Sequence, residues 1–323
     1  MKKKILIILM LFISVFAFSA CGSKKENKEK ENSKKEIATP LMYEVTKEGS
    51  NNKIYILGTI HIGDLSNVEF SDYVLNAFDK SEYVAAEVDN EDPSEDGSML
   101  DEINSIIYPD DDNLKNHLTE EQYNKLMKFI DDNKLDEGYF NKDKLNLKYY
   151  LQVLMQYVIE ESGLNTDDGI DNYFVNKAKK EGKKFLEVES SEFQNEVLLS
   201  LSDSFYAKSL METIDNIDEE IENAKNDFKN WKEGNEEELW KDDGSLIKEE
   251  DYSKYSEEDI KAAKDFDEKI LYSRNLSMTD KFEEFFNNGY NMFFMVGQDH
   301  VIGDKGIVSY LRQRGYTVNK ISK

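Results

Sequence analysis

Two histidines stand in matching surroundings at opposite ends of the chain. The first follows the apolar run Ile54-Tyr-Ile-Leu in the order Gly58-Thr-Ile-His61, and the second follows Phe293-Phe-Met-Val in the order Gly297-Gln-Asp-His300. In both, Gly-Asp comes one or two residues later. A neutral imidazole is the commonest metal ligand, and it can also carry a proton near neutral pH. The repetition predicts that both histidines serve one site; two unrelated loop histidines are the alternative.

Carboxylates follow two further apolar runs. Glu87 ends Tyr83-Val-Ala-Ala-Glu87, and Glu189 ends Phe185-Leu-Glu-Val-Glu189. An ionised carboxylate beside a core strand is costly unless it is paired, protonated or bound to a cation. Two imidazoles and a carboxylate with an open position suit Zn²⁺, Mn²⁺ or Fe²⁺. The expected cofactor is therefore a divalent metal (Mn, Co, Zn or Fe) held by His61, His300, Glu87 and Glu189; salt bridges from the carboxylates to arginines are the alternative.

The elements that must position these side chains follow from hydrophobic periodicity. A turn signal at Gly49-Ser-Asn-Asn indicates that the first two strands form a hairpin. Predicted strands cover residues 41–45, 53–57, 83–88, 185–188, 292–296 and 316–321. Predicted helices cover residues 119–131 (opened by a Thr119 capping box), 145–161, 169–180, 192–230, 257–286 and 303–315 (closed by Gly315).

Strands near both ends of the chain with helices between them predict one α/β (α+β) domain. Its central mixed sheet is built from N- and C-terminal strands, with a large helical middle region. Sites in open α/β sheets form beyond the carboxyl ends of the strands. A glycine there permits a tight turn and a close backbone approach. We therefore expect Gly58 and Gly297 to support the site by aiming both histidines into one crevice.

The N-terminus predicts export and lipid anchoring. Lys2, Lys3 and Lys4 precede an apolar run over residues 5–18, shorter than the roughly 20 residues of a membrane-spanning helix. The run ends at Ser19-Ala-Cys21, which resembles a bacterial lipobox and contains the one cysteine of the chain. We expect residues 1–20 to be a signal peptide and Cys21 to carry lipid, anchoring the protein at the extracytoplasmic face of the cell membrane. An ordinary signal peptide or short anchor is the alternative.

The remaining boundaries follow from composition. Residues 21–38 are rich in Lys, Glu and Asn, with no apolar side chain before Ile37, which predicts a disordered tether because such a segment buries too little surface. The folded domain is then residues 39–323. An acidic segment at about residues 232–258, with Trp231 and Trp240 in or beside it, is expected to be an exposed linker or helical excursion that the tryptophans anchor.

Several classes of function are disfavoured. The net charge of −26 repels phosphate backbones, so nucleic acid is not an expected partner. One cysteine excludes a disulfide framework and a Cys-rich metal site. The sequence contains no His-Glu-x-x-His, Gly-x-Ser-x-Gly, Walker A or Gly-x-Gly-x-x-Gly motif. His117 is expected to be structural at a helix end, and Phe282, Phe285 and Phe286 are expected to belong to the core rather than to a haem pocket.

An ordered set of motifs runs from Leu41 to the C-terminus. Its members are Gly58-Thr-Ile-His61, Glu87-Val-Asp89, Gly169-Ile-Asp-Asn-Tyr-Phe, Glu189-Ser-Ser-Glu-Phe-Gln194, Arg274-Asn275 and Val296-Gly-Gln-Asp-His300. This set resembles the TraB/PrgY/GumN family, which includes the Tiki proteases and is similar in fold to the ChaN and erythromycin-esterase groups. The chain departs from the family pattern at Ser190, usually Thr, and in the acidic segment.

The resemblance implies a metal-dependent hydrolase acting on a peptide or protein substrate. His61 and His300 would be ligands or proton-transfer groups, and Glu87 a ligand or general base. Arg274, oriented by Asn275, would hold a substrate carboxylate or an oxyanion; a structural salt bridge to Asp171, Glu187 or Glu189 is the alternative. The family also leaves open a non-catalytic lipoprotein that sequesters a peptide or binds haem or iron. The substrate and oligomeric state are not specified.

Overall fold

The computed structural model describes residues 35–88, 104–135, 141–190, 201–241, 245, 247 and 249–321. The predicted signal peptide, Cys21 and most of the predicted tether lie outside these residues. Strand β1 (Glu36–Ala38) pairs in parallel with β4 (Val68–Phe70), so regular structure begins within the last residues assigned to the tether. Within the described ranges, no helix is long and apolar enough to cross a membrane.

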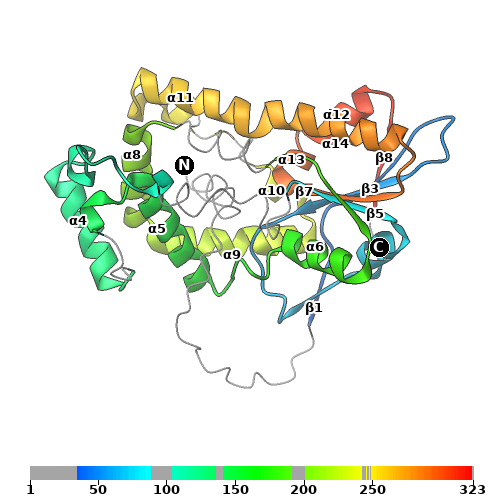
Figure 1. Ribbon diagram of the computed structural model, residues 1–323, viewed down its shortest axis with the longest axis horizontal. Helices are drawn as coiled ribbons and strands as arrows, with labels where there is room; N and C mark the ends of the chain where they lie inside the picture. The colour runs from blue at the N-terminus through cyan, green and yellow to red at the C-terminus, as the bar shows by residue number, and fades with distance from the viewer. Residues whose placement is uncertain are drawn as a thin grey trace.

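The central sheet has six strands in the order β6-β5-β7-β3-β2-β8. The predicted hairpin is confirmed, because β2 and β3 pair antiparallel, and β8 then pairs antiparallel with β2. The late strand β7 lies between β3 and β5 and is parallel to both. The predicted mixed sheet from both ends of the chain is confirmed (Figure 1). Its strands are β2 (Met42–Thr46), β3 (Ile54–Thr59), β5 (Tyr83–Ala86), β6 (Lys184–Glu187), β7 (Met292–Gly297) and β8 (Thr317–Ile321).

The register of β3 and β7 brings the two histidine motifs together. Gly58 lies opposite Val296, and Thr59 lies opposite Gly297. Because the two strands are parallel, both chains leave the sheet at the same edge and at adjacent positions. Strands β5 and β6 run in the same direction beside them, so the residues that follow these strands also emerge at this edge.

Helices flank the sheet and extend away from it on one side (Figure 1). Helices α11 and α12 run one after the other along the top of the view, α9 runs along the bottom, and α4, α5 and α8 gather at the left. The longer helices are α2 (Asp72–Lys80), α4 (Glu120–Asp132), α5 (Leu147–Ser162), α6 (Ile170–Glu181), α8 (Asp203–Asp215), α9 (Ile217–Glu233), α11 (Glu257–Asp267), α12 (Arg274–Asn287) and α14 (Ile307–Gln313). Shorter ones are η2 (Leu114–Asn116), η3 (Lys142–Lys144), α10 (Glu236–Leu239), η4 (Glu249–Lys254), the π-helical turn η5 (Glu268–Ser273) and α13 (Gln298–Val301).

Local signals in the sequence fix several helix ends. The Thr119 capping box is present, with the Thr119 hydroxyl accepting from the Gln122 N–H and the Gln122 side chain reaching back to the cap. Gly315 follows α14 with φ of +83°, a conformation that favours glycine. The predicted helix over residues 192–230 is wrong as a single element, because α8 ends and α9 begins at Asn216. That residue leaves helical geometry and donates its side-chain amide back to the Glu212 carbonyl.

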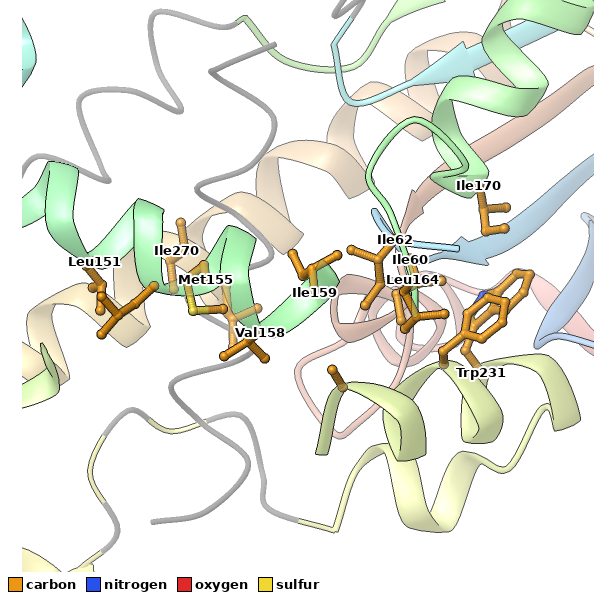
Figure 2. Packing of buried hydrophobic residues seen from close by; sticks show 14 of the residues in the cluster. Ile60, Ile62, Leu151, Met155, Val158, Ile159, Leu164, Ile170, Trp231 and Ile270 are labelled. Carbon is orange, nitrogen blue, oxygen red and sulfur yellow. The ribbon is translucent and has the colours of Figure 1, made fainter. Parts of the chain in front are cut away.

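Buried side chains cover both faces of the sheet. On β3, Tyr55 and Leu57 belong to a large cluster on one face, while Ile54 and Ile56 belong to a smaller cluster on the other. Burial on both faces explains why the sequence of this strand is nearly continuously apolar. The larger cluster extends over α5 and α9, as Figure 2 shows in part. The smaller one contains the predicted core residues Phe282, Phe285 and Phe286.

Candidate functional site

The loop after β3 turns His61 toward the carboxyl edge of the sheet. Ile60 and Ile62 are buried in the large cluster beside Leu164 (Figure 2), and His61 between them keeps 16% of its side chain exposed. The start of α6 packs on this loop, because the Ile170 N–H donates to the Ile60 carbonyl over 3.0 Å. A Cβ on Gly169 would lie 2.8 Å from the His61 carbonyl oxygen, so only glycine permits this approach.

The first turn of α6 supplies a carboxylate partner for His61. Nδ1 of His61 lies 2.9 Å from Oδ2 of Asp171, and the Thr59 hydroxyl donates to Oδ1 of the same carboxylate over 2.5 Å. Burial alone would lower the pKa of His61, but the charge and hydrogen bond of Asp171, with a further contribution from Glu87, raise that pKa to about 9. Asp171 therefore fixes the orientation of the ring through Nδ1.

His300 is held by an amide rather than by a carboxylate. Its Nδ1 lies 2.6 Å from Oδ1 of Asn275, and Nδ2 of Asn275 donates to the Lys305 carbonyl over 2.9 Å. Because the amide nitrogen is engaged there, the amide oxygen faces the imidazole and accepts from Nδ1–H. Burial and the charge of Arg274 lower the pKa of His300 to about 3. His300 is therefore a neutral imidazole with its lone pair on Nε2.

Glu87 and Glu189 share one fully buried arginine. Nη2 of Arg274 lies 2.7 Å from Oε2 of Glu87 and 2.6 Å from Oε2 of Glu189, and Nε donates to Glu189 as well. Nη1 donates to the Ile270 carbonyl in the π-helical turn. Arg274 is 0% exposed, so its guanidinium is used within the protein.

Glu87 remains ionised in this environment. Burial alone would raise the pKa of its carboxyl, but the charge of Arg274, followed by those of His300 and His61, lowers it. The Gly297 N–H also donates to Oε1 of Glu87 over 2.7 Å. The other oxygen faces Arg274, so the carboxylate is fixed between the end of β7 and α12.

Gly297 is the point around which three of the predicted site residues meet. A Cβ built on it would lie 3.3 Å from Oε1 of Glu87, 3.6 Å from Cδ2 of His300 and 4.0 Å from Nε2 of His61. These side chains come from the ends of β5, β7 and β3. Any larger residue at position 297 would fill the space between them.

The donor types around Gly297 fit a metal ion, but the donor atoms lie farther apart than the ligand atoms of a bound ion would. Nδ1 of each histidine lies within 2.9 Å of a carboxylate or amide oxygen, the arrangement that metal-ligating histidines usually have. Nε2 of His300 lies 3.9 Å from Oε1 of Glu87, against about 3.4 Å for donors around a tetrahedral ion with bonds of about 2.1 Å. Accordingly, no group of three His, Cys, Asp or Glu side chains in the described ranges is disposed to hold an ion as it stands. Glu189 turns both oxygens to Arg274.

Two carboxylates at the site were not among the predicted site residues. Asp171 was considered only as a partner of Arg274; its place in the first turn of a helix that follows Gly169 was the available signal. Asp299 lies inside the second histidine motif. Burial raises the pKa of its carboxyl to about 6, while the charge of His61 lowers it and that of Glu87 raises it. Asp299 directly precedes His300 in the chain.

His117 lies elsewhere, at the end of η2. Its Nε2 is 2.8 Å from Asp112, its Nδ1 is 2.6 Å from Asp203 at the start of α8, and its ring stacks on Tyr108. These contacts join η2 to α8 and leave the sheet edge untouched.

Comparison with known proteins gives one match. The sequence model of the TraB/PrgY/gumN family matches residues 41–320, a range that contains all the side chains around Gly297. Neither the curated proteins nor the solved structures contain a match to the chain.

Proposed function

The chain belongs to the TraB/PrgY/gumN family, and on that premise we propose that it is a metal-dependent hydrolase that cleaves peptides. The observation that carries the proposal is the meeting of His61, His300 and Glu87 around Gly297. Two Nδ1-anchored imidazoles and an ionised carboxylate at one strand edge are a donor set that Mn, Co, Zn or Fe accepts.

In this proposal His61 and His300 would hold the ion through Nε2, and Glu87 would hold it through Oε1. An ion held there would lower the pKa of a bound water and polarise the scissile carbonyl. Glu189 is not one of the ligands, because both of its oxygens accept from Arg274. Bringing Nε2 of His300 and Oε1 of Glu87 from 3.9 Å to about 3.4 Å requires side-chain shifts of about 0.5 Å in total.

Arg274 and Asn275 act as positioning residues. Arg274 keeps Glu87 ionised and aims Oε1 away from the guanidinium. Asn275 keeps His300 in the tautomer whose lone pair lies on Nε2. The buried guanidinium has no access to a substrate carboxylate, so we propose the salt-bridge role for Arg274 rather than substrate contact.

Hydrolysis is tested by incubating the purified protein with a mixture of unstructured peptides and identifying products by mass spectrometry. We expect cleavage that a chelator abolishes and that His61→Ala and His300→Ala abolish, while the matched variant His117→Gln cleaves normally. Cleavage unchanged in His61→Ala would contradict the assignment.

A non-catalytic binder is the second candidate, favoured by the fact that Arg274 does not reach a substrate. It would sequester a peptide or bind haem or iron with the same side chains. A Soret band in the purified protein supports haem, and peptide binding without turnover supports sequestration.

We also propose that the protein is a lipoprotein anchored through Cys21 at the extracytoplasmic face of the membrane. The support is the lipobox-like Ser19-Ala-Cys21 after a short apolar run. We expect radiolabelled palmitate to be incorporated into the chain and Cys21→Ser to abolish incorporation. Equal incorporation in the variant would contradict the proposal.

A further inference from the structure

One of the two tryptophans of the chain contacts the first histidine motif, and the other contacts the loop that follows the second. Trp231, at the end of α9, is buried, and its indole N–H donates to the Gly58 carbonyl over 2.8 Å. The Gly58 N–H in turn donates to the Leu41 carbonyl over 3.1 Å. Gly58, the first residue of the first motif, is thus hydrogen-bonded through both its N–H and its carbonyl, and Trp231 belongs with Leu164 to the large buried cluster (Figure 2).

Trp240 packs against the loop that follows the second motif. A Cβ on Gly303 would lie 2.3 Å from Cζ2 of Trp240, and Gly303 has φ of +83°, so both space and backbone require glycine there. Two residues later, the Lys305 carbonyl accepts a hydrogen bond from the Asn275 side-chain amide. Trp240 therefore packs against one side of the loop. On the other side, the Lys305 carbonyl binds Asn275, the residue that orients His300.

Both tryptophans lie on one short stretch that is itself tied to the sheet. The Thr39 N–H donates to the Lys232 carbonyl over 2.7 Å, beside β1. Glu236 pairs with Lys320 of β8 over 3.1 Å. The stretch is thus attached at Lys232 and at Glu236 to segments that carry none of the site residues.

We propose that residues 231–240 form a clamp that sets the position of the two histidine motifs relative to each other, with Trp231 and Trp240 as its positioning residues. The clamp deepens the proposed function, because it acts on the same site, and it gives the start of the acidic segment a role. Trp231 acts on His61 through Gly58, and Trp240 acts on His300 through the Gly303 loop and Asn275.

The test uses the two histidines as probes in the metal-stripped full chain. Three histidines make ¹³C-histidine NMR spectra simple, and His117→Gln identifies the third resonance. Trp231→Phe removes the indole donor and keeps a ring, and Trp240→Leu removes the packed ring; Trp240→Phe is the milder substitute if Trp240→Leu does not fold. Tyr290→Leu is the matched control, because Tyr290 stacks on Tyr83 at 4.2 Å near the opposite end of the same sheet.

We expect a reciprocal pattern. Trp231→Phe should shift the His61 resonances and leave those of His300 unchanged, and the Trp240 variant should do the reverse; general loosening of the fold would not give this pairing.

In both variants the affinity for Mn²⁺, measured by electron paramagnetic resonance, should fall roughly 10–100-fold. The proposal is overturned if both histidines keep their resonances in the tryptophan variants, or if both move together in each of them. Tyr290→Leu, at the opposite end of the sheet, should leave both histidines unchanged. A wild-type protein that binds no Mn²⁺, Co²⁺, Zn²⁺ or Fe²⁺ contradicts the proposed function, and the NMR result still decides on the clamp.

Discussion

At the scale of single residues, hydrogen bonds away from the reacting atoms determine what each histidine can do. Asp171 and Asn275 both bind Nδ1, but one is a carboxylate and the other an amide. The carboxylate raises the pKa of His61, while burial and Arg274 lower that of His300. Two imidazoles from similar sequence motifs therefore carry different charges in the metal-free protein.

Asn275 gives a direct test of this account. Asn275→Leu keeps the volume and leaves the Lys305 carbonyl and the His300 Nδ1–H without partners. A buried group that loses its partner costs about 1–3 kcal/mol, so we expect a loss of about 2 kcal/mol or more in urea unfolding. Asn275→Asp still accepts from His300 and should keep most of the Mn²⁺ affinity. Equal Mn²⁺ affinity in Asn275→Leu and the wild type would contradict the role of Asn275.

The pKa of His61 predicts that the free energy of unfolding of the metal-free protein, measured in the presence of a chelator, depends on pH. The folded pKa of about 9 lies above the ordinary value of 6.5, so the folded state binds the proton more tightly than the unfolded state. The stabilisation is complete below pH 6.5 and is lost as the pH rises through 9. The difference in unfolding free energy between wild type and His61→Gln should shrink over this window by up to about 3 kcal/mol. A constant difference in urea titrations would contradict the Asp171–His61 pairing.

At the scale of elements, the edge of the sheet and the helix ends assemble the site. The π-helical turn η5 ends directly before Arg274 and Asn275. These consecutive residues are both buried and bind different partners, Arg274 the two glutamates and Asn275 His300. Turns of this kind occur often at functional sites inside helices.

The end of β7 offers a substitution that separates folding from the site. Gly297 has φ of −48° and ψ of 138°, which alanine adopts without strain. Its Cβ would enter the space between Glu87 and His61. We therefore expect Gly297→Ala to keep its circular dichroism spectrum and melting temperature within a few degrees while metal content and peptide cleavage are lost. An active Gly297→Ala protein would show that the space around Gly297 is not the site.

The sequence predicted the sheet, most helices and the two histidine motifs, because these depend on local periodicity and on a repeated pattern. It did not predict the Asp171–His61 pairing, since this depends on where α6 packs after a long excursion of the chain. The break at Asn216 and the π-helical turn were also missed, because one polar residue or one extra residue per turn scarcely alters the hydrophobic pattern of a helix. The Glu189–Arg274 pair was named only as an alternative, since Glu189 also suited a metal site and Arg274 also suited a substrate site.

At the scale of the whole molecule, the sheet contains strands from both ends of the chain. The chain as a whole carries a net charge of −26. Like charges of this number repel one another in the compact state, and salt screens them over about 30 Å at 10 mM and about 10 Å at 100 mM. We expect the melting temperature in chelator to rise by several degrees between these NaCl concentrations. A fall would mean that surface ion pairs, such as Arg314 with Asp280 and Glu283, outweigh the repulsion.

The most direct test of the account is the metal content of the purified protein. Elemental analysis should compare the wild type, the His61→Ala/His300→Ala double variant and His117→Gln, whose histidine lies outside the site. The account predicts one equivalent of Mn, Co, Zn or Fe in the wild type and in His117→Gln, and none in the double variant. A wild-type protein that stays empty after reconstitution with all four ions would contradict it.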